Sequence, residues 1–431
     1  MFCQLDVLRH CFPPYIRRAL SELPESMDET FVRILREIKM EARGPAYRLL
    51  QCISVAVRPL RVEELAEILA LDFDGAEVPW LVGGRRWEQP EEAVQTICSN
   101  LVMVVDTGHS RVIQFSHFSV EDFLTSDRLA SHHFGDISQF YIAHEAAHTT
   151  LTQACLATLL QLDGSSSNDQ VECNFPLAGY ASQHWVEHAQ FGVVSTQIED
   201  GMRRLFDLTR PYFAAWIRLY DIDDHWNQAG NSWVARGSPL YYASLCGFRG
   251  LAAHIINDHP EQVNATGGRR HSPLAAALYK GYFHVAELLL QHGASVDVTD
   301  YNNQTLLQVA SMDGHSGVTR WLLDNGADTN SQGDDHAAPI HLGTMNGHLD
   351  VIRTLLKYNV YVDSMDKDGR TALHLASSSG KVEIVRLLLE HGANANAVDK
   401  DGRTPLSLTS TTEVVRLLLD YGASPNEGRT T

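Results

Sequence analysis

The sequence predicts a mostly α-helical protein, with a helical N-terminal half that contains a β-hairpin and a C-terminal half built as a solenoid of short repeats. Three observations support this fold class. Segments similar to GSPLYYASLCG (237–247) recur through the C-terminal half, and the last four steps between them are each 33 residues long. Apolar residues follow helical spacing in the N-terminal half, as in MDETFVRILREIKM. Two strand-like runs flank the turn sequence Asp-Thr-Gly-His-Ser in residues 101–117.

Composition and charge narrow the classes of function. The chain has 431 residues, 44% of them apolar, which allows two or three domains with packed cores. A formal net charge of −19 argues against a nucleic-acid or anionic-membrane partner, because both need positive charge on the protein. The seven cysteines form no C-x-x-C pair and are odd in number, which is typical of reduced thiols in a cytoplasmic protein. We expect no signal peptide, and no apolar run is long enough to cross a bilayer.

Six segments of the C-terminal half share one position in front of a short apolar stretch. This position falls at Ser238, Ser272, Thr305, Ala338, Thr371 and Thr404. Ser or Thr there can cap the start of a helix, and a following Pro suits the first helical turn. Glycines such as Gly314 and Gly347 suit the turn between two short helices, and Gly293 and Gly326 suit a left-handed helix end. One such helix pair cannot bury its own apolar face, so we expect the pairs to stack.

These segments resemble the ankyrin repeat, whose signature is T-P-L-H-x-A followed by G-H, L-L-L and G-A. RTALHLASSSG (370–380) and the following IVRLLLEHGA are examples. The resemblance implies about six repeats over residues 236–431, with atypical first and last repeats. Three departures, Gln308, Ala338 and the pair Asn359-Val360, are expected to weaken local packing without breaking the register.

The N-terminal half predicts several helices, then a hairpin, then another helix, which is the order of a winged helix. Helices are expected near residues 27–40, 46–57, 61–71, 92–100 and 119–126, with the hairpin between the last two. We therefore expect a helical segment over residues 1–45, a winged-helix domain over 46–128 and a helical connector over 129–235.

This order resembles the region that follows the nucleotide-binding domain of fungal NACHT–ankyrin proteins, which are STAND-type NTPases related to NLR receptors. The matching stretches are LSELPESMDETFVRILREI (20–38), RPLRVEELAEILALDF (58–73), ICSNLV (97–102) and HFSVEDFL (117–124). The same type of winged helix also occurs beside inositol deacylases. The sequence contains no G-x-x-x-x-G-K-[ST] loop, so the NACHT domain is absent from it and we do not predict ATP hydrolysis by this chain. The chain is either a stand-alone derivative or a fragment of an ATP-dependent STAND switch.

His117 has two interpretations. In STAND proteins a winged-helix histidine near this point contacts bound ADP, and the resemblance implies this cofactor-binding role for His117 only where a NACHT domain is present. The alternative is a histidine that forms hydrogen bonds to the backbone within the core. For the chain alone we predict no cofactor.

Residues 144–148 spell HEAAH, the H-E-x-x-H pattern of zinc proteases. On a helix, His144 and His148 would share one face, and Glu145 could act as a general base toward a metal-bound water. No third ligand follows, because Leu151 and Ala154 stand where the extended motif needs Gly and His. We predict instead a long amphipathic helix over YIAHEAAHTTLTQACLATLLQL, in which His148 packs or forms a hydrogen bond. A zinc hydrolase remains a remote alternative, and we predict no catalytic residue and no metal.

A protein partner is expected on the concave side of the repeats. The free positions there are the turn tips and the ends of the first helices, and Arg, Tyr and Met are enriched at interface cores. The candidate binding residues are Arg270, Tyr279, Lys280, Met312, Asp313, Met345, Asn346 and Arg370. The alternative is a solvated groove without a partner. We therefore predict a non-enzymatic, regulatory interaction module without a nucleic-acid, membrane or metal partner.

Overall fold

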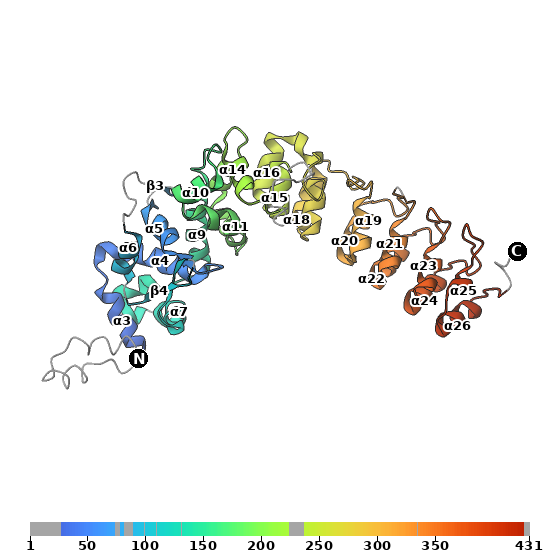
Figure 1. The fold of residues 1–431 in the computed structure, drawn as a ribbon, viewed down its shortest axis with the longest axis horizontal. Helices are drawn as coiled ribbons and strands as arrows, with labels where there is room; N and C mark the ends of the chain where they lie inside the picture. The colour runs from blue at the N-terminus through green and yellow to red at the C-terminus, as the bar shows by residue number, and fades with distance from the viewer. Residues whose placement is uncertain are drawn as a thin grey trace. The chain divides into compact units, whose positions relative to one another are not determined.

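The structure is a computed structural model that divides into two compact units, Met1–Asn231 and Ser232–Thr431. It describes residues 27–73, 78–81, 89–98, 100–108, 110–130, 132–223, 237–333 and 335–425. The helices expected within residues 1–26 lie outside this described part. Within it, helices dominate and strands are few, as the sequence predicts (Figure 1).

The first described helix carries the predicted apolar stripe. Helix α3 (Met27–Glu37) has Asp28 and Glu29 in its first turn, where negative charge stabilises the positive end of the helix dipole. It buries Phe31, Ile34 and Leu35. The ring of Phe31 lies 5.5 Å from the ring of Phe123 in helix α7 (Phe118–Leu124), so α3 packs against the winged helix that follows.

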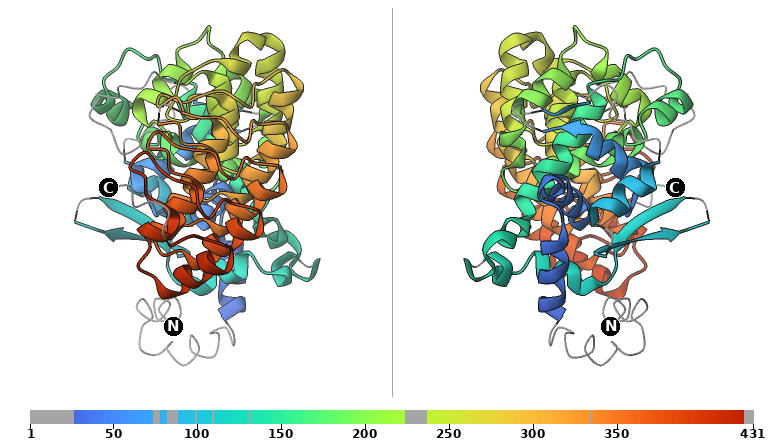
Figure 2. Two further views of the ribbon diagram at one scale, coloured as in Figure 1. Left: turned by 90° about the vertical axis from the view of Figure 1, so that its right-hand side faces the viewer. Right: turned by 90° about the vertical axis from the view of Figure 1, so that its left-hand side faces the viewer.

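The winged helix is present, and it contains three short strands that the sequence did not predict. Its helices and strands are α4 (Arg43–Val55), β1 (Leu60–Arg61), α5 (Val62–Ala70), α6 (Pro90–Cys98), β4 (Val102–Asp106), β5 (Arg111–Phe115) and α7 (Phe118–Leu124). Strands β4 and β5 form the predicted antiparallel hairpin, which projects from this unit in both views of Figure 2. Strand β1 pairs with β5 and completes a sheet of order β1-β5-β4. A second small sheet pairs β2 (Leu71–Asp72) with β3 (Trp80–Leu81).

A bundle of further helices completes the first unit. Its members are η2 (Met40–Ala42), α8 (Asp127–Ala130), η3 (His132–Phe140), α9 (His144–Leu159), α10 (Asn168–Asn174), α11 (Ala178–Ala189), α12 (Val194–Gln197), α13 (Glu199–Phe206) and α14 (Tyr212–Leu219). Helix α9 contacts α4, α11 and α13, and residues 154–159 of α9 are all buried. The expectation of an amphipathic helix here was therefore wrong, because α9 is covered on several sides.

The second unit contains six helix pairs within its described residues, and they follow one another along the chain (Figure 1). We call the first helix of each pair the inner helix and the second the outer helix. The pairs are α15 (Pro239–Leu245) with α16 (Arg249–Asp258), α17 (Pro273–Tyr279) with α18 (Phe283–Gln291), α19 (Leu306–Asp313) with α20 (Ser316–Asp324), α21 (Pro339–Asn346) with α22 (Leu349–Lys357), α23 (Ala372–Ser378) with α24 (Val382–Glu390), and α25 (Pro405–Leu408) with α26 (Thr412–Asp420). A short 3₁₀ helix, η4 (Pro260–Asn264), follows α16.

The local signals in the sequence set these helix boundaries. All six predicted capping positions are N-caps, and the hydroxyl of Ser272, for example, accepts a hydrogen bond from the backbone N–H of Ala275. Gly314 adopts a φ of 79°, a left-handed conformation that a residue without a Cβ adopts at little cost. The last inner helix, α25, has only four residues, so the last repeat is atypical, as predicted.

Two of the three departures from the repeat pattern are accommodated. Gln308 Oε1 accepts a hydrogen bond from the N–H of Thr305 at 2.7 Å, and Gln308 Nε2 donates one to the carbonyl of Ala337 at 2.7 Å. Asn359 takes the left-handed conformation of the missing glycine, with a φ of 56°, and Val360 after it is buried. The weakened packing expected at these positions is therefore not seen in their contacts.

Candidate functional site

The ends of the inner helices present large apolar side chains at the same position of three successive repeats. Tyr279 is the last residue of α17, and Met312 and Met345 are the next-to-last residues of α19 and α21. Tyr279 is 44% exposed and Met345 is 52% exposed, whereas Met312 is half-buried. We call these three residues the apolar stripe.

A polar residue follows each member of the apolar stripe. Lys280, Asp313 and Asn346 are all exposed, so each apolar side chain has a solvated polar neighbour. The amide of Asn346 donates to the carbonyl of Leu342 at 3.1 Å and therefore stabilises the end of its own helix. This combination of exposed apolar side chains beside a polar rim is typical of protein interfaces.

The two predicted arginines have different surroundings. The Arg270 guanidinium lies over the Tyr279 ring, with Cζ 3.3 Å from the ring centroid, and this cation–π contact joins two predicted binding residues. Arg370 forms ion pairs with Asp366 and Asp368, each at 2.9 Å. Its charge is therefore already balanced within its own loop, which makes Arg270 the stronger candidate for contact with a partner.

The tips of the loops between repeats contact one another. The N–H of Lys367 donates to the carbonyl of Asp335, and the N–H of Lys400 donates to the carbonyl of Asp368, both at 3.0 Å. Lys367 Nζ also lies 2.6 Å from the carboxylate of Asp335. These polar tip residues hold neighbouring repeats together.

A cavity of about 80 Å³ lies between the inner helices α17 and α19. Three of the predicted binding residues, Arg270, Tyr279 and Asp313, line it, together with apolar residues of both helices. Sequence reasoning placed these three residues at an interface but did not predict a cavity behind them.

His117 is the N-cap of α7 and is exposed. Its Nδ1 accepts a hydrogen bond from the backbone N–H of Ser119 at 3.2 Å and lies 2.6 Å from the Ser119 hydroxyl. The next residue, Phe118, is 72% exposed, and both it and Val57 border a surface hollow of about 340 Å³. His117 thus makes the backbone contact of one interpretation, but on the surface instead of in the core.

The HEAAH residues make structural contacts. Glu145 accepts a hydrogen bond from the N–H of Val193 at 3.0 Å, and His144 is exposed at the start of α9. His148 Nδ1 lies 2.9 Å from Nδ1 of His188 on α11. No group of three or more His, Cys, Asp or Glu in the described ranges is placed to hold a metal ion. The contacts of His148 fit the predicted packing role.

His188 lies in a chain of buried hydrogen bonds. Its Nε2 lies 2.7 Å from the Tyr180 hydroxyl, which accepts a hydrogen bond from the N–H of Val57 at 3.1 Å. One proton arrangement satisfies every member: Tyr180 donates to His188 Nε2, and His188 Nδ1–H donates to Nδ1 of His148. Burial, then the neighbouring His148 and His184, lower the pKa of His188 to about 3. His188 is therefore neutral at physiological pH and ties α11 to α9 and to the turn before β1.

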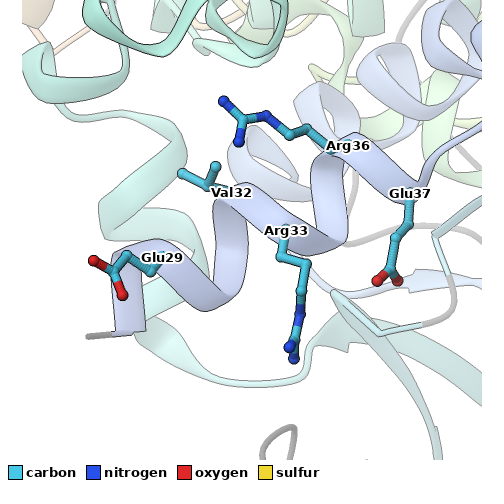
Figure 3. A pocket seen from close by; sticks show the side chains of 5 residues that line it. All are labelled: Glu29, Val32, Arg33, Arg36 and Glu37. Carbon is cyan, nitrogen blue, oxygen red and sulfur yellow. The ribbon is translucent and has the colours of Figure 1, made fainter. Parts of the chain in front are cut away.

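A surface hollow of about 350 Å³ lies along α3 (Figure 3). Its lining residues are Glu29, Val32, Arg33, Arg36 and Glu37, which all come from this one helix. Figure 3 shows their side chains leaving the helix in different directions, so they do not converge on a common point. We assign no function to this hollow.

Comparison with known proteins identifies the repeats. Residues 240–333 and 340–429 match the family described as ankyrin repeats (three copies). The C-terminal repeats are ankyrin repeats. Residues 35–135 match the family described as the winged helix domain of GPI inositol-deacylase, in agreement with the winged helix seen in the structure.

The chain is 32% identical over 293 residues to "azaphilone pigments biosynthesis cluster protein L" of Monascus ruber, and this match covers 64% of the chain and 60% of that protein. The chain thus spans less than two thirds of the length of this relative. A crystal structure of an ankyrin repeat domain from Acinetobacter baumannii is 30% identical, with a TM-score of 0.39, and the match covers 43% of this chain and 98% of that chain.

Among the described residues, no helix is both long enough and apolar enough to cross a bilayer.

Proposed function

We propose that this protein is a non-enzymatic interaction module whose ankyrin repeats bind a protein partner along the apolar stripe of Tyr279, Met312 and Met345. The observation that carries this proposal is the exposure of large apolar side chains at one repeated position, 44% for Tyr279 and 52% for Met345. Tyrosine and arginine side chains often dominate the energetics of protein interfaces, and Arg270 lies directly over Tyr279. The ankyrin family match supports this function.

The N-terminal half has a regulatory role in this proposal. It comprises a helical segment over 1–45, a winged helix over 46–128 and a helical connector over 129–235. We place the protein in the cytoplasm, and the free, buried thiols of Cys52 and Cys155 support a reducing location. The net charge of −19 disfavours nucleic acid as the partner.

A second candidate is a part of an ATP-dependent, STAND-type signalling switch in fungi. The observation that favours it is the exposed pair His117 and Phe118 beside the hollow of about 340 Å³ on the winged helix, where a further domain could dock. In this candidate His117 contacts nucleotide only when a NACHT domain is present. Reading the genomic sequence upstream of Met1 tests it: an in-frame P-loop supports the switch, and an upstream stop codon with a promoter contradicts it.

The interaction proposal is tested by a quantitative pull-down from native extract. The test variant combines Tyr279→Ala, Met312→Ala and Met345→Ala. The control variant combines Tyr361→Ala and Met365→Ala, since these side chains are also exposed, at 66% and 49%, but lie outside the apolar stripe.

We expect the test variant to lose specific partners and the control variant to keep them, with unchanged circular dichroism for both. A partner set that is the same for the native chain and the test variant contradicts the proposal.

A further inference from the structure

One position of the inner helices links four of the repeats to the repeat that follows. The residue three positions after the N-cap reaches toward the loop that precedes the next inner helix. Gln308 donates to Ala337 O at 2.7 Å, and the Nε2 atoms of His341 and His374 lie 3.2 and 3.1 Å from the carbonyls of Arg370 and Arg403. In the first repeat the equivalent Tyr241 hydroxyl accepts a hydrogen bond from the N–H of Arg270 at 3.0 Å.

The second repeat lacks this link. Its equivalent residue is Ala275, whose methyl group can neither donate nor accept a hydrogen bond. The inner helices of adjacent repeats contact each other along the described array, and this contact is weakest between α17 and α19. The cavity of about 80 Å³ occupies this junction.

The chemistry of the cavity is mainly apolar. The side chains that form its apolar wall are Ala275, Leu278, Leu306, Val309, Ala310 and Val318. Its volume of about 80 Å³ is roughly half that of an apolar cavity of 150 Å³ that binds benzene, so a branched aliphatic side chain is the appropriate size of occupant.

Arg270 supplies a charge at the mouth of this cavity. Among the described residues, its buried Nε has no hydrogen-bond partner, and no carboxylate forms an ion pair with the guanidinium. Asp300, which also lines the cavity, instead accepts hydrogen bonds from the N–H groups of Asn302 and Gln304, each at 2.9 Å. A partly buried cation without a counter-ion is costly, so a carboxylate brought by a ligand would be stabilised here.

We propose that the groove between α17 and α19 binds a segment of a protein partner in which a branched aliphatic residue stands beside a carboxylate. The aliphatic side chain fills the cavity, and the carboxylate pairs with the planar guanidinium of Arg270. The proposal rests on the proposed function, because Tyr279 belongs to both the groove and the apolar stripe. It adds the chemical class of the segment and the place where it binds.

The test pans a library of random dodecapeptides displayed on phage against the full chain. Selected sequences are expected to place Asp or Glu next to, or one residue from, Leu, Ile or Val. A synthetic peptide with the selected sequence is then titrated into the full chain, and its fluorescence anisotropy gives the affinity.

Three variants separate the two parts of the site. Ala275→His fills the cavity and can form the hydrogen bond that His341 and His374 form. Arg270→Gln removes the charge but leaves the cavity. Arg353→Gln is the control, because Arg353 is an exposed arginine on the outer helix α22.

Arg270→Gln should bind the selected peptide about 10-fold more weakly or worse, since a hydrogen-bonded charge pair accounts for at least that factor. Ala275→His should also bind the peptide more weakly, because its side chain occupies the cavity, and Arg353→Gln should bind it normally. Replacing the acidic residue of the peptide by its amide should weaken binding to the native chain and have no further effect on Arg270→Gln. Ala275→His should also raise the melting temperature, which shows that it folds.

Three results would overturn the inference. The first is that panning against the native chain enriches no peptides relative to panning against Ala275→His, and the second is that the selected peptides share a basic or neutral consensus sequence. The third is that Arg270→Gln binds the selected peptide with the same affinity as the native chain. If Ala275→His keeps the partners of the native chain while the triple variant of the apolar stripe loses them, the groove is not the binding site. The proposed function would still hold in that case.

Discussion

Lowering the pH from 7 to 5 should destabilise the N-terminal unit, and the buried His188 should account for a defined part of the loss. Its side chain is fully buried, at 0% exposure, between the Tyr180 hydroxyl and His148. In the folded chain its pKa is lowered to about 3, first by burial and then by His148 and His184. In the unfolded chain the pKa of a histidine is about 6.5.

The sign follows from proton uptake. Between pH 6.5 and about 3 the unfolded chain binds a proton at residue 188 and the folded chain does not, so stability falls as the pH falls through this window. Well inside this window, the free energy of unfolding falls by about 1.4 kcal/mol for each unit by which the pH is lowered. Integrated from pH 7 to 5, His188 alone should lower the free energy of unfolding by about 2 kcal/mol.

The assay compares His188→Gln with the native chain in urea at pH 7, 6 and 5. Hydrogen-exchange mass spectrometry of peptides from α9 and α11 reports the N-terminal unit separately from the repeats. His144→Gln is the matched control, because His144 belongs to the same helix as His148 but is exposed.

The pH-dependent loss of stability between pH 7 and 5 should be about 2 kcal/mol smaller in His188→Gln than in the native chain, although the variant is less stable at pH 7. The control should keep the native dependence. If His188→Gln and the native chain lose the same free energy over this range, the reasoning about His188 is refuted.

Glu64→Gln should lower the free energy of unfolding of the N-terminal unit by about 2 kcal/mol, because this buried carboxylate accepts hydrogen bonds from two arginines. An unchanged midpoint of urea unfolding would show that these bonds are not stabilising. Gln308→Ala should destabilise the repeats by about 1–3 kcal/mol through two lost hydrogen bonds, whereas the exposed Gln291→Ala should not, as thermal unfolding will show. Deleting residues 403–431 should expose the apolar face of the fifth repeat and cause aggregation, and light scattering equal to that of the full chain would reject the capping role of the last repeat. Metal analysis of the purified protein should find no stoichiometric zinc; one equivalent of zinc that is lost in His144→Ala would revive the zinc-hydrolase alternative.

The repeats could be predicted closely from the sequence because their signals are local. A capping hydroxyl such as that of Thr305, a proline such as Pro339 in the first turn and a left-handed glycine such as Gly314 each specify a helix boundary within a few residues of chain. Recurrence at 33 residues then repeats each signal.

The cavity at α17 could not be predicted from such signals, because it arises from a contact that is missing between repeats. The aligned repeats nevertheless contain a signal of the missing hydrogen bond. The position three residues after the N-cap is Tyr241, Ala275, Gln308, His341, His374 and Ser407, and only the alanine lacks a polar group. Reading that column for hydrogen-bonding capacity would have located the weak junction.

In the N-terminal half, long-range packing explains what sequence reasoning missed. Strand β1 has two residues, too few for an alternating pattern to be recognised. Helix α9 was expected to be amphipathic, and its burial on several sides depends on α4 and α11, which the local sequence does not reveal. The partner of His148 is 40 residues away along the chain, so its role could be predicted but its partner could not.

Contact between the apolar stripe and a protein partner can be captured by site-specific photo-crosslinking. A benzophenone amino acid is placed at Met345 or, as the control, at Tyr361, whose side chains are 52% and 66% exposed. We predict that light attaches a discrete protein from native extract at position 345, and that the same protein is not attached at position 361. Equal attachment at both positions, or attachment only at 361, would show that the apolar stripe does not bind the partner.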